Sequence, residues 1–121
     1  MSPRLAKALT EAGVDNLSFY PAIITYTTTR EWHEVFAFNL VGLVSVVDFR
    51  KSDITSYDGD FMMDSSIRGF EVDPNKARDL AMFRLAENCM TVLVHQRIKD
   101  AVDRAGINTF SFVEPKNWVQ L

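Results

Sequence analysis

His33 lies in the segment Arg-Glu-Trp-His-Glu-Val-Phe, between Glu31 and Glu34. A histidine flanked by carboxylates has the residue types needed for metal binding or for acid–base catalysis. The helical zinc motif needs a second histidine four residues away with a glutamate between the two, and His33 has no such neighbour. The other histidine, His95, precedes a predicted helix. We therefore interpret both histidines as structural or surface residues, and a small hydrolase that uses His33 with Asp48 or Glu34 is the least favoured hypothesis.

The single cysteine, Cys89, could act as a nucleophile only with a base beside it to generate the thiolate, and neither histidine is adjacent in the sequence. A buried or turn-side thiol is the favoured interpretation. The sequence contains no Gly-x-Ser-x-Gly elbow, no phosphate-binding glycine loop and no Cys-x-x-Cys pair. It therefore predicts no catalytic, cofactor-binding or metal-binding residue, and it predicts that the protein is not an enzyme.

Carboxylates are more numerous, and four aspartates fall in one predicted loop region. Such a group could bind Ca²⁺, but the spacing of a calcium loop, with its glutamate at the twelfth position, is missing. The region is then either an acidic recognition surface or a solvated loop between strands. The candidate partner-binding residues are these aspartates and the aromatic residues among them: Asp53, Tyr57, Asp58, Asp60, Phe61 and Asp64.

Trp32 and Trp118 are alternative anchors for a partner, because tryptophan is enriched at interface hot spots. An amphipathic ring can equally cover the edge of a hydrophobic core. We expect both tryptophans to do the latter.

The composition limits the class of protein. The chain has 121 residues, of which 47% are hydrophobic and 24% charged, with a net charge of -3, and these values predict one globular domain over residues 1–121. Its basic residues are scattered, so nucleic acid is not an expected partner. There is no apolar run of about 20 residues and no signal peptide, so we expect no membrane partner. Together with the lone cysteine, these features predict a cytoplasmic location.

A repeated unit must position these residues. The stretch "AGVDNLSFYP" from Ala12 returns as "AGINTFSFVEP" from Ala105, and an apolar stripe at helical spacing precedes each copy. The pattern predicts amphipathic helices over about 3–12 and 96–105, each followed by a glycine that caps the helix. A strand is expected after each glycine, over 17–26 in the first copy and 110–113 in the second. The repeat is interpreted as scaffold.

Between the two copies the pattern is mostly strand and turn. It predicts an apolar strand over 34–49 broken near Gly42, with a helical turn over 41–46 as the alternative. The further predicted elements are a strand over 67–73, a helical turn over 74–79, a strand over 80–86, a turn at Asn88 and a strand over 90–94.

These elements predict an α+β fold, an α/β layer in which two amphipathic helices pack on a mixed, largely antiparallel β-sheet. A helix-Gly-strand unit lies near each end of the chain. The second helix follows a strand and the first does not. Either the first copy is shorter, or an upstream strand lies outside this chain.

The order of these segments resembles the eleventh immunity protein family of bacterial polymorphic toxin systems, formerly catalogued as a domain of unknown function. The resemblance rests on the opening helix-Gly-strand unit, then "FNLVGLVSVVDFRKS", "MFRLAE" and "VLVHQRIKDAVDRAGINTFSF". Its most specific elements are Asp48 with Lys51-Ser52, the run Met82–Leu85, and the closing helix-Ala-Gly-strand unit. The chain departs from the family in having His95 where a serine typically caps the second helix. Members also carry more sequence upstream.

The resemblance implies a cytoplasmic binding protein that neutralises a cognate bacterial toxin, with no cofactor. It supplies no toxin-contacting residues that can be transferred to this sequence. The alternative from a different class is a self-associating structural or assembly module, in which an open sheet edge pairs with itself to form a homodimer. The sequence does not identify the toxin or the face that binds it.

Overall fold

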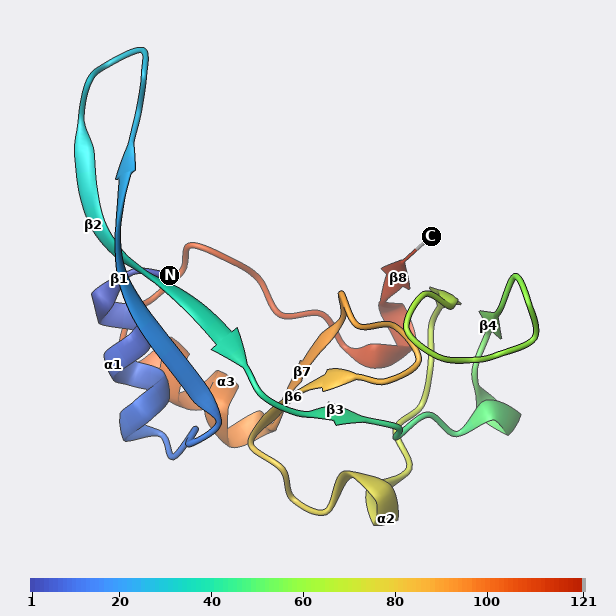
Figure 1. Ribbon diagram of the computed structural model, residues 1–121. Helices are drawn as coiled ribbons and strands as arrows, with labels where there is room; N and C mark the ends of the chain where they lie inside the picture. Colours follow the sequence, from blue (N-terminus) through green and yellow to red (C-terminus); the bar gives the residue numbers. More distant parts are fainter. Residues whose placement is uncertain (121) are drawn as a thin grey trace.

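Three small β-sheets and three α-helices make up the fold of residues 1–120, which the computed structural model describes (Figure 1). The helices are α1 (Pro3–Glu11), α2 (Pro74–Ala77) and α3 (Gln96–Arg104), with 3₁₀-helices η1 (Phe49–Lys51) and η2 (Pro115–Asn117). The strands are β1 (Leu17–Thr25), β2 (Trp32–Leu40), β3 (Leu43–Val44), β4 (Ile54–Thr55), β5 (Ser66–Arg68), β6 (Met82–Leu85), β7 (Val92–Val94) and β8 (Val119–Gln120). The predicted α+β class is confirmed, although the strands are divided among three sheets.

The two predicted amphipathic helices are α1 and α3, and their caps follow from the sequence. Ser2 accepts a hydrogen bond from the backbone N–H of Leu5, and Pro3 takes the first helical position, where its missing N–H costs nothing. His95 caps α3 in the same way, since its Nδ1 accepts from the N–H of Arg97 at 3.2 Å. His95 is therefore a capping residue, which confirms its structural interpretation.

The helices α1 and α3 lie side by side, so the two repeated units pack on each other (Figure 1). The guanidinium of Arg4 donates to the carbonyl of Ala105, which links the start of the first unit to the end of the second helix. The core between the two helices is formed by five buried apolar residues: Leu9, Val14, Ile98, Val102 and Ile107.

A long antiparallel hairpin, β1–β2, projects beyond α1 and reaches past the rest of the molecule (Figure 1). Pro21 lies in the middle of β1 opposite Phe36. The N–H of Tyr26 bonds to the carbonyl of Glu31, so in the alternating ladder the residue at position 21 directs its backbone away from β2. Proline is tolerated there because no ladder hydrogen bond is lost. The outward backbone of Phe36 bonds instead to Met1.

The other two sheets enclose the second core. The sheet β3-β6-β7 is mixed, with a parallel β3–β6 pair, and β4-β5-β8 is antiparallel. The apolar run over 34–49 breaks as predicted at Gly42, whose φ of +130° ends one strand and begins the next. The core between these sheets contains six buried residues: Val46, Val47, Ile67, Phe70, Phe83 and Leu85.

The strand predicted over 110–113 does not form, so the second repeated unit lacks the strand of the first. Within residues 1–120, the backbone of residues 108–113 makes no hydrogen bond to other backbone groups. The segment is held at its ends, by the N–H of Ile107 bonding to Val102 and by the carbonyl of Pro115 accepting from Phe70. Alternating Phe-Ser-Phe residues favour a strand locally, but pairing also requires a neighbouring strand in register.

Several predicted elements are shorter than expected, and one alternative is wrong. After Gly42 the strand predicted over 34–49 continues only as β3, Leu43–Val44. The strand over 67–73 stops at Arg68, because Gly69 adopts a φ of +105°. The helical turn over 74–79 ends at Ala77, and Arg78 adopts a left-handed conformation that helices cannot continue. No helical turn forms over 41–46. The β6–β7 hairpin with its turn at Asn88 is confirmed.

Candidate functional site

The six candidate partner-binding residues lie on one exposed stretch, residues 53–64, which we call the acidic loop. It includes the short strand β4 near its start and ends before β5 (Figure 1). All six side chains are exposed to solvent, and no lysine or arginine occurs between residues 52 and 67. The structure therefore brings four aspartates together on one surface segment without an internal cation. The sequence prediction of an acidic, exposed loop is consistent with this placement.

The tip of the acidic loop is held by local hydrogen bonds. The Oδ1 of Asp58 accepts from the backbone N–H of Asp60 at 2.9 Å, and the hydroxyl of Ser56 lies 2.9 Å from the same oxygen. These donors lower the pKa of the Asp58 carboxyl, with the Asp60 N–H as the larger cause. Asp58 is therefore a fixed negative charge at neutral pH.

Apolar side chains lie among these charges. Tyr57 is fully exposed, and the ring of Phe61 lies edge-on to that of Phe49 with centroids 5.3 Å apart. Met62 and Met63 are 42% and 50% exposed beside them. Aromatic and methionine side chains are enriched in protein–protein interfaces, where they supply contact area.

The end of the acidic loop is anchored to the β6–β7 turn through buried groups that the sequence did not single out. The side chain of Asn88 donates to the carbonyl of Ser65 at 2.8 Å, and the N–H of Ser65 bonds to the carbonyl of Glu87. The side chain of Glu87 is completely buried, and its Oε1 accepts from the Ser45 hydroxyl at 2.6 Å. A glutamate at the end of an alternating strand resembles a surface residue in the sequence, so nothing local indicated its burial.

The residues of the hydrolase hypothesis are not brought together. His33 is exposed on β2, where its ring meets Tyr26 edge-on at 5.6 Å. Glu34 is the next residue on the same strand, so its side chain lies on the opposite face of the hairpin. Asp48 caps η1, across the molecule from the hairpin (Figure 1). Within residues 1–120, no three His, Cys, Asp or Glu side chains are grouped to hold a metal ion.

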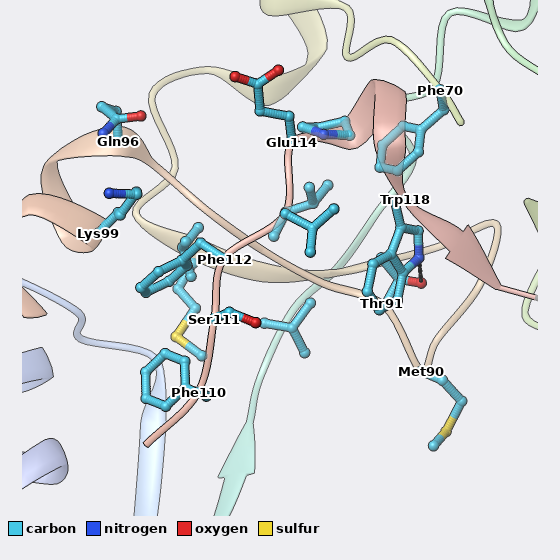
Figure 2. A pocket seen from close by; sticks show the side chains of 16 residues that line it. Phe70, Met90, Thr91, Gln96, Lys99, Phe110, Ser111, Phe112, Glu114 and Trp118 are labelled. Carbon is cyan, nitrogen blue, oxygen red and sulfur yellow. Dashed lines mark hydrogen bonds between the residues drawn. The ribbon is translucent and has the colours of Figure 1, made fainter. Parts of the chain in front are cut away.

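The two tryptophans have different roles. Trp118 packs against the second core, and its indole N–H donates to the Thr91 hydroxyl at 3.1 Å (Figure 2). The prediction that it covers a core edge is confirmed. Trp32 is 62% exposed near the hairpin tip, so the same prediction is wrong for Trp32. The hairpin extends beyond the body of the protein, and there is no core beside this ring to cover.

Beside Trp118 is a groove of about 510 Å³, between β7 and the segment 110–115 (Figure 2). Its walls are mostly apolar, and the rings of Phe110 and Phe112 meet edge-on across 5.2 Å. Lys99 lies at the rim, but its ammonium is 2.6 Å from the Asp103 carboxylate, which raises the pKa of the lysine and neutralises its charge locally. The groove is suited to apolar side chains rather than to an anion.

Comparison with known proteins adds one match. A family model described as "Immunity protein family (Imm11)" matches residues 1–117. A search of curated proteins finds no match. Each helix in the described residues, 1–120, is too short or too polar to cross a membrane.

Proposed function

This chain belongs to the Imm11 immunity protein family, whose model covers residues 1–117 of 121, and from this membership we propose that it binds and neutralises a cognate toxin of a bacterial polymorphic toxin system. The family match is the observation that carries the proposal. The protector would act in the cytoplasm of the cell that makes it. Neutralisation by binding requires no catalytic group in this chain, because an occupied or blocked toxin site is sufficient.

The acidic loop is the surface that we assign to the toxin. Its six candidate residues combine four carboxylates with Tyr57 and Phe61 as apolar anchors. Toxins that act on nucleic acids are often basic, and an acidic surface on the protector would accelerate their encounter by electrostatic steering. Once the two proteins are in contact, burial of the aromatic anchors would slow dissociation. A nanomolar complex, about -12 kcal/mol, generally buries roughly 800 Å² on each partner.

The first test is co-expression with the products of the neighbouring genes. We expect one product to arrest growth when expressed alone, and this chain to restore growth and co-purify with that product in equal amounts. A catalytically dead version of the toxin should still co-purify, because binding and not turnover is proposed. A chain that restores growth without forming a stable complex would contradict neutralisation by binding. If no neighbouring product is toxic and none is retained, the proposed function is wrong.

If the acidic loop steers the toxin, removing its charges should slow association. The triple variant Asp58→Asn, Asp60→Asn, Asp64→Asn should slow association with the toxin about tenfold at low salt, and the difference should shrink near 0.5 M salt, where charges are screened beyond a few ångströms. Asparagine keeps an acceptor oxygen for the Asp60 N–H, so the loop conformation should be retained. Stopped-flow or surface-based kinetics at several salt concentrations would measure the association rate constants.

The matched control removes the same net charge elsewhere. Glu11, Asp15 and Asp79 are exposed and lie outside the acidic loop. The variant Glu11→Gln, Asp15→Asn, Asp79→Asn should therefore associate at nearly the wild-type rate. Equal slowing in both variants would show that only net charge matters, and the assignment of the acidic loop would be incorrect.

A further inference from the structure

The two faces of the projecting β1–β2 hairpin differ in what they contact. Because paired residues of β1 and β2 lie on the same face, the register Leu17 with Leu40 places Phe19, Phe36 and Phe38 on one face. Near the base of the hairpin this inner face packs toward α1, where Phe38 lies with Met1, Leu5 and Leu9 around a small apolar cavity. Ile23 and Trp32, farther along the same face, are exposed. The residues of the opposite face, which we call the outer face, are Ser18, Tyr20, Ala22, Ile24, His33, Val35, Ala37 and Asn39, with Tyr26 following β1.

The outer face is apolar although it faces solvent. Tyr20 is 57% exposed, Ile24 49% and Tyr26 55%. None of the residues that the two strands contribute to this face is Asp, Glu, Lys or Arg, and the nearest such charges at the hairpin tip are Arg30 and Glu31. The solvent side of a two-stranded sheet is ordinarily polar, and contiguous exposed apolar surface marks a site that another molecule covers. An isolated two-stranded hairpin is also only marginally stable in water.

From these observations we infer that the outer face is a homodimer contact, where the hairpin of a second copy packs face to face. A face without formal charge meets no like-charge repulsion when it packs on its own copy, and it offers nothing to attract a basic partner. The acidic loop has the opposite property, since two copies of it would repel each other. The two surfaces are therefore suited to different partners, a second copy on the hairpin and a toxin on the loop.

Packing of the faces is favoured over pairing of the strand edges. Pro21 removes an N–H donor from the middle of the β1 edge. On the β2 edge, the N–H and carbonyl of Phe36 already form hydrogen bonds with Met1. Both edges are thus interrupted, as in sheets that are protected against edge-to-edge association. Face-to-face packing needs no free backbone groups, and a two-fold axis makes it self-complementary and closed.

The area indicates a weak dimer. A large side chain has a surface of roughly 200 Å², and those on the outer face expose about half of it. Together with their smaller neighbours they would bury on the order of 500 Å² per copy, near the lower limit for specific interfaces. The dissociation constant should then be on the order of 10–100 μM. Dimers should accumulate only in concentrated solution.

Sedimentation equilibrium of the chain alone tests the inference, between about 5 μM and 1 mM. We expect the average mass to rise from 13.8 kDa toward twice that value. Ile24→Lys should raise the dissociation constant at least tenfold, because it places ammonium groups opposite each other in the dimer. Ile23→Lys is the matched control: it is the next residue, makes the same chemical change, and lies on the inner face opposite Glu34. It should dimerise like the wild type.

Circular dichroism would check that both variants are folded, and Tyr20→Lys would replace Ile24→Lys if that variant is not. A wild-type mass that stays at 13.8 kDa throughout would overturn the inference, and so would equal effects of Ile23→Lys and Ile24→Lys. If the wild type is monomeric and Ile24→Lys loses toxin binding, the outer face belongs to the toxin and the dimer is wrong. The mass measurement contains no toxin. The test of the dimer can therefore fail or succeed independently of the proposed function.

Discussion

Replacement of Glu87 by alanine is expected to lower the free energy of unfolding by about 2–4 kcal/mol, a large part of the stability of a domain this size. The carboxylate accepts from the Ser45 hydroxyl at 2.6 Å and lies 3.4 Å from the N–H of Val47. Alanine would leave the buried N–H of Val47 without this acceptor, would remove the partner of the hydroxyl of the exposed Ser45, and would open a cavity. Urea denaturation followed by circular dichroism would measure the change.

Glu87→Gln keeps the size of the side chain and one acceptor oxygen, so it separates the effect of the cavity and the lost acceptor from the change of chemical group. Glutamine keeps an acceptor for Ser45 but places N–H donors where the Oε2 of Glu87 is buried without a partner, so it should cost about 1–3 kcal/mol, less than alanine, which also opens a cavity. Glu114→Ala, at an exposed carboxylate, should leave the midpoint unchanged within error. Equal destabilisation by Ala and Gln would contradict the assignment of the cost to the lost acceptor and the cavity.

The same position links stability to the acidic loop. The backbone carbonyl of Glu87 accepts from Ser65, and Asn88 pairs with Asp64 at the end of the loop. A variant that loosens Glu87 should therefore also increase the motion of the loop end. The residues that hold the end of the proposed toxin surface are therefore also buried residues on which stability depends.

Local signals explain what the sequence could predict. Ser2, Gly13 and Gly106 mark helix ends through short-range hydrogen bonds and positive φ, and these depend on few neighbours. The break at Gly42 and the turn at Asn88 are of the same kind. The exposed part of the acidic loop after β4 was also predictable, because a run of small polar and acidic residues favours a turn or loop over a buried strand.

Long-range arrangement explains what the sequence could not predict. Residues 110–113 have the alternation of a strand, yet their state depends on where Ile107 and Pro115 are fixed. The partners of Glu87 lie 40 and 42 residues away along the chain, so its burial could not be inferred locally. The exposure of Trp32 follows from the projection of the hairpin beyond α1. The apolar outer face was likewise hidden, because alternating apolar residues ordinarily predict a buried strand face.

A second stability prediction concerns Gly69, whose backbone contacts both the start of the acidic loop and the turn at Lys116. Its φ is +105°, and a Cβ built there would lie 2.6 Å from the carbonyl oxygen of Lys116. The obstacle is backbone, so it cannot be avoided by a side-chain rotation. Gly69→Ala should therefore cost about 3–4 kcal/mol, from both a strained conformation and a steric clash.

The consequences of this clash reach two regions. The carbonyl of Gly69 accepts from the N–H of Asp53 at the start of the acidic loop, and the next residue, Phe70, donates to Pro115 in the turn that precedes Trp118. A shift at Gly69 should thus loosen the loop and move Trp118 away from Thr91. Tryptophan fluorescence should shift to the red in the variant, in addition to a lower urea midpoint.

Gly59→Ala is the control that separates the steric clash with Lys116 from the strain of a positive φ. Gly59 also has a positive φ, of +84°, but its Cβ would have no atom within 4 Å. Its substitution should cost only about 1 kcal/mol, the penalty for a left-handed alanine. If the two alanine variants lose the same stability, backbone strain alone limits both positions. The close approach of Lys116 to Gly69 would then make no contribution to the choice of glycine.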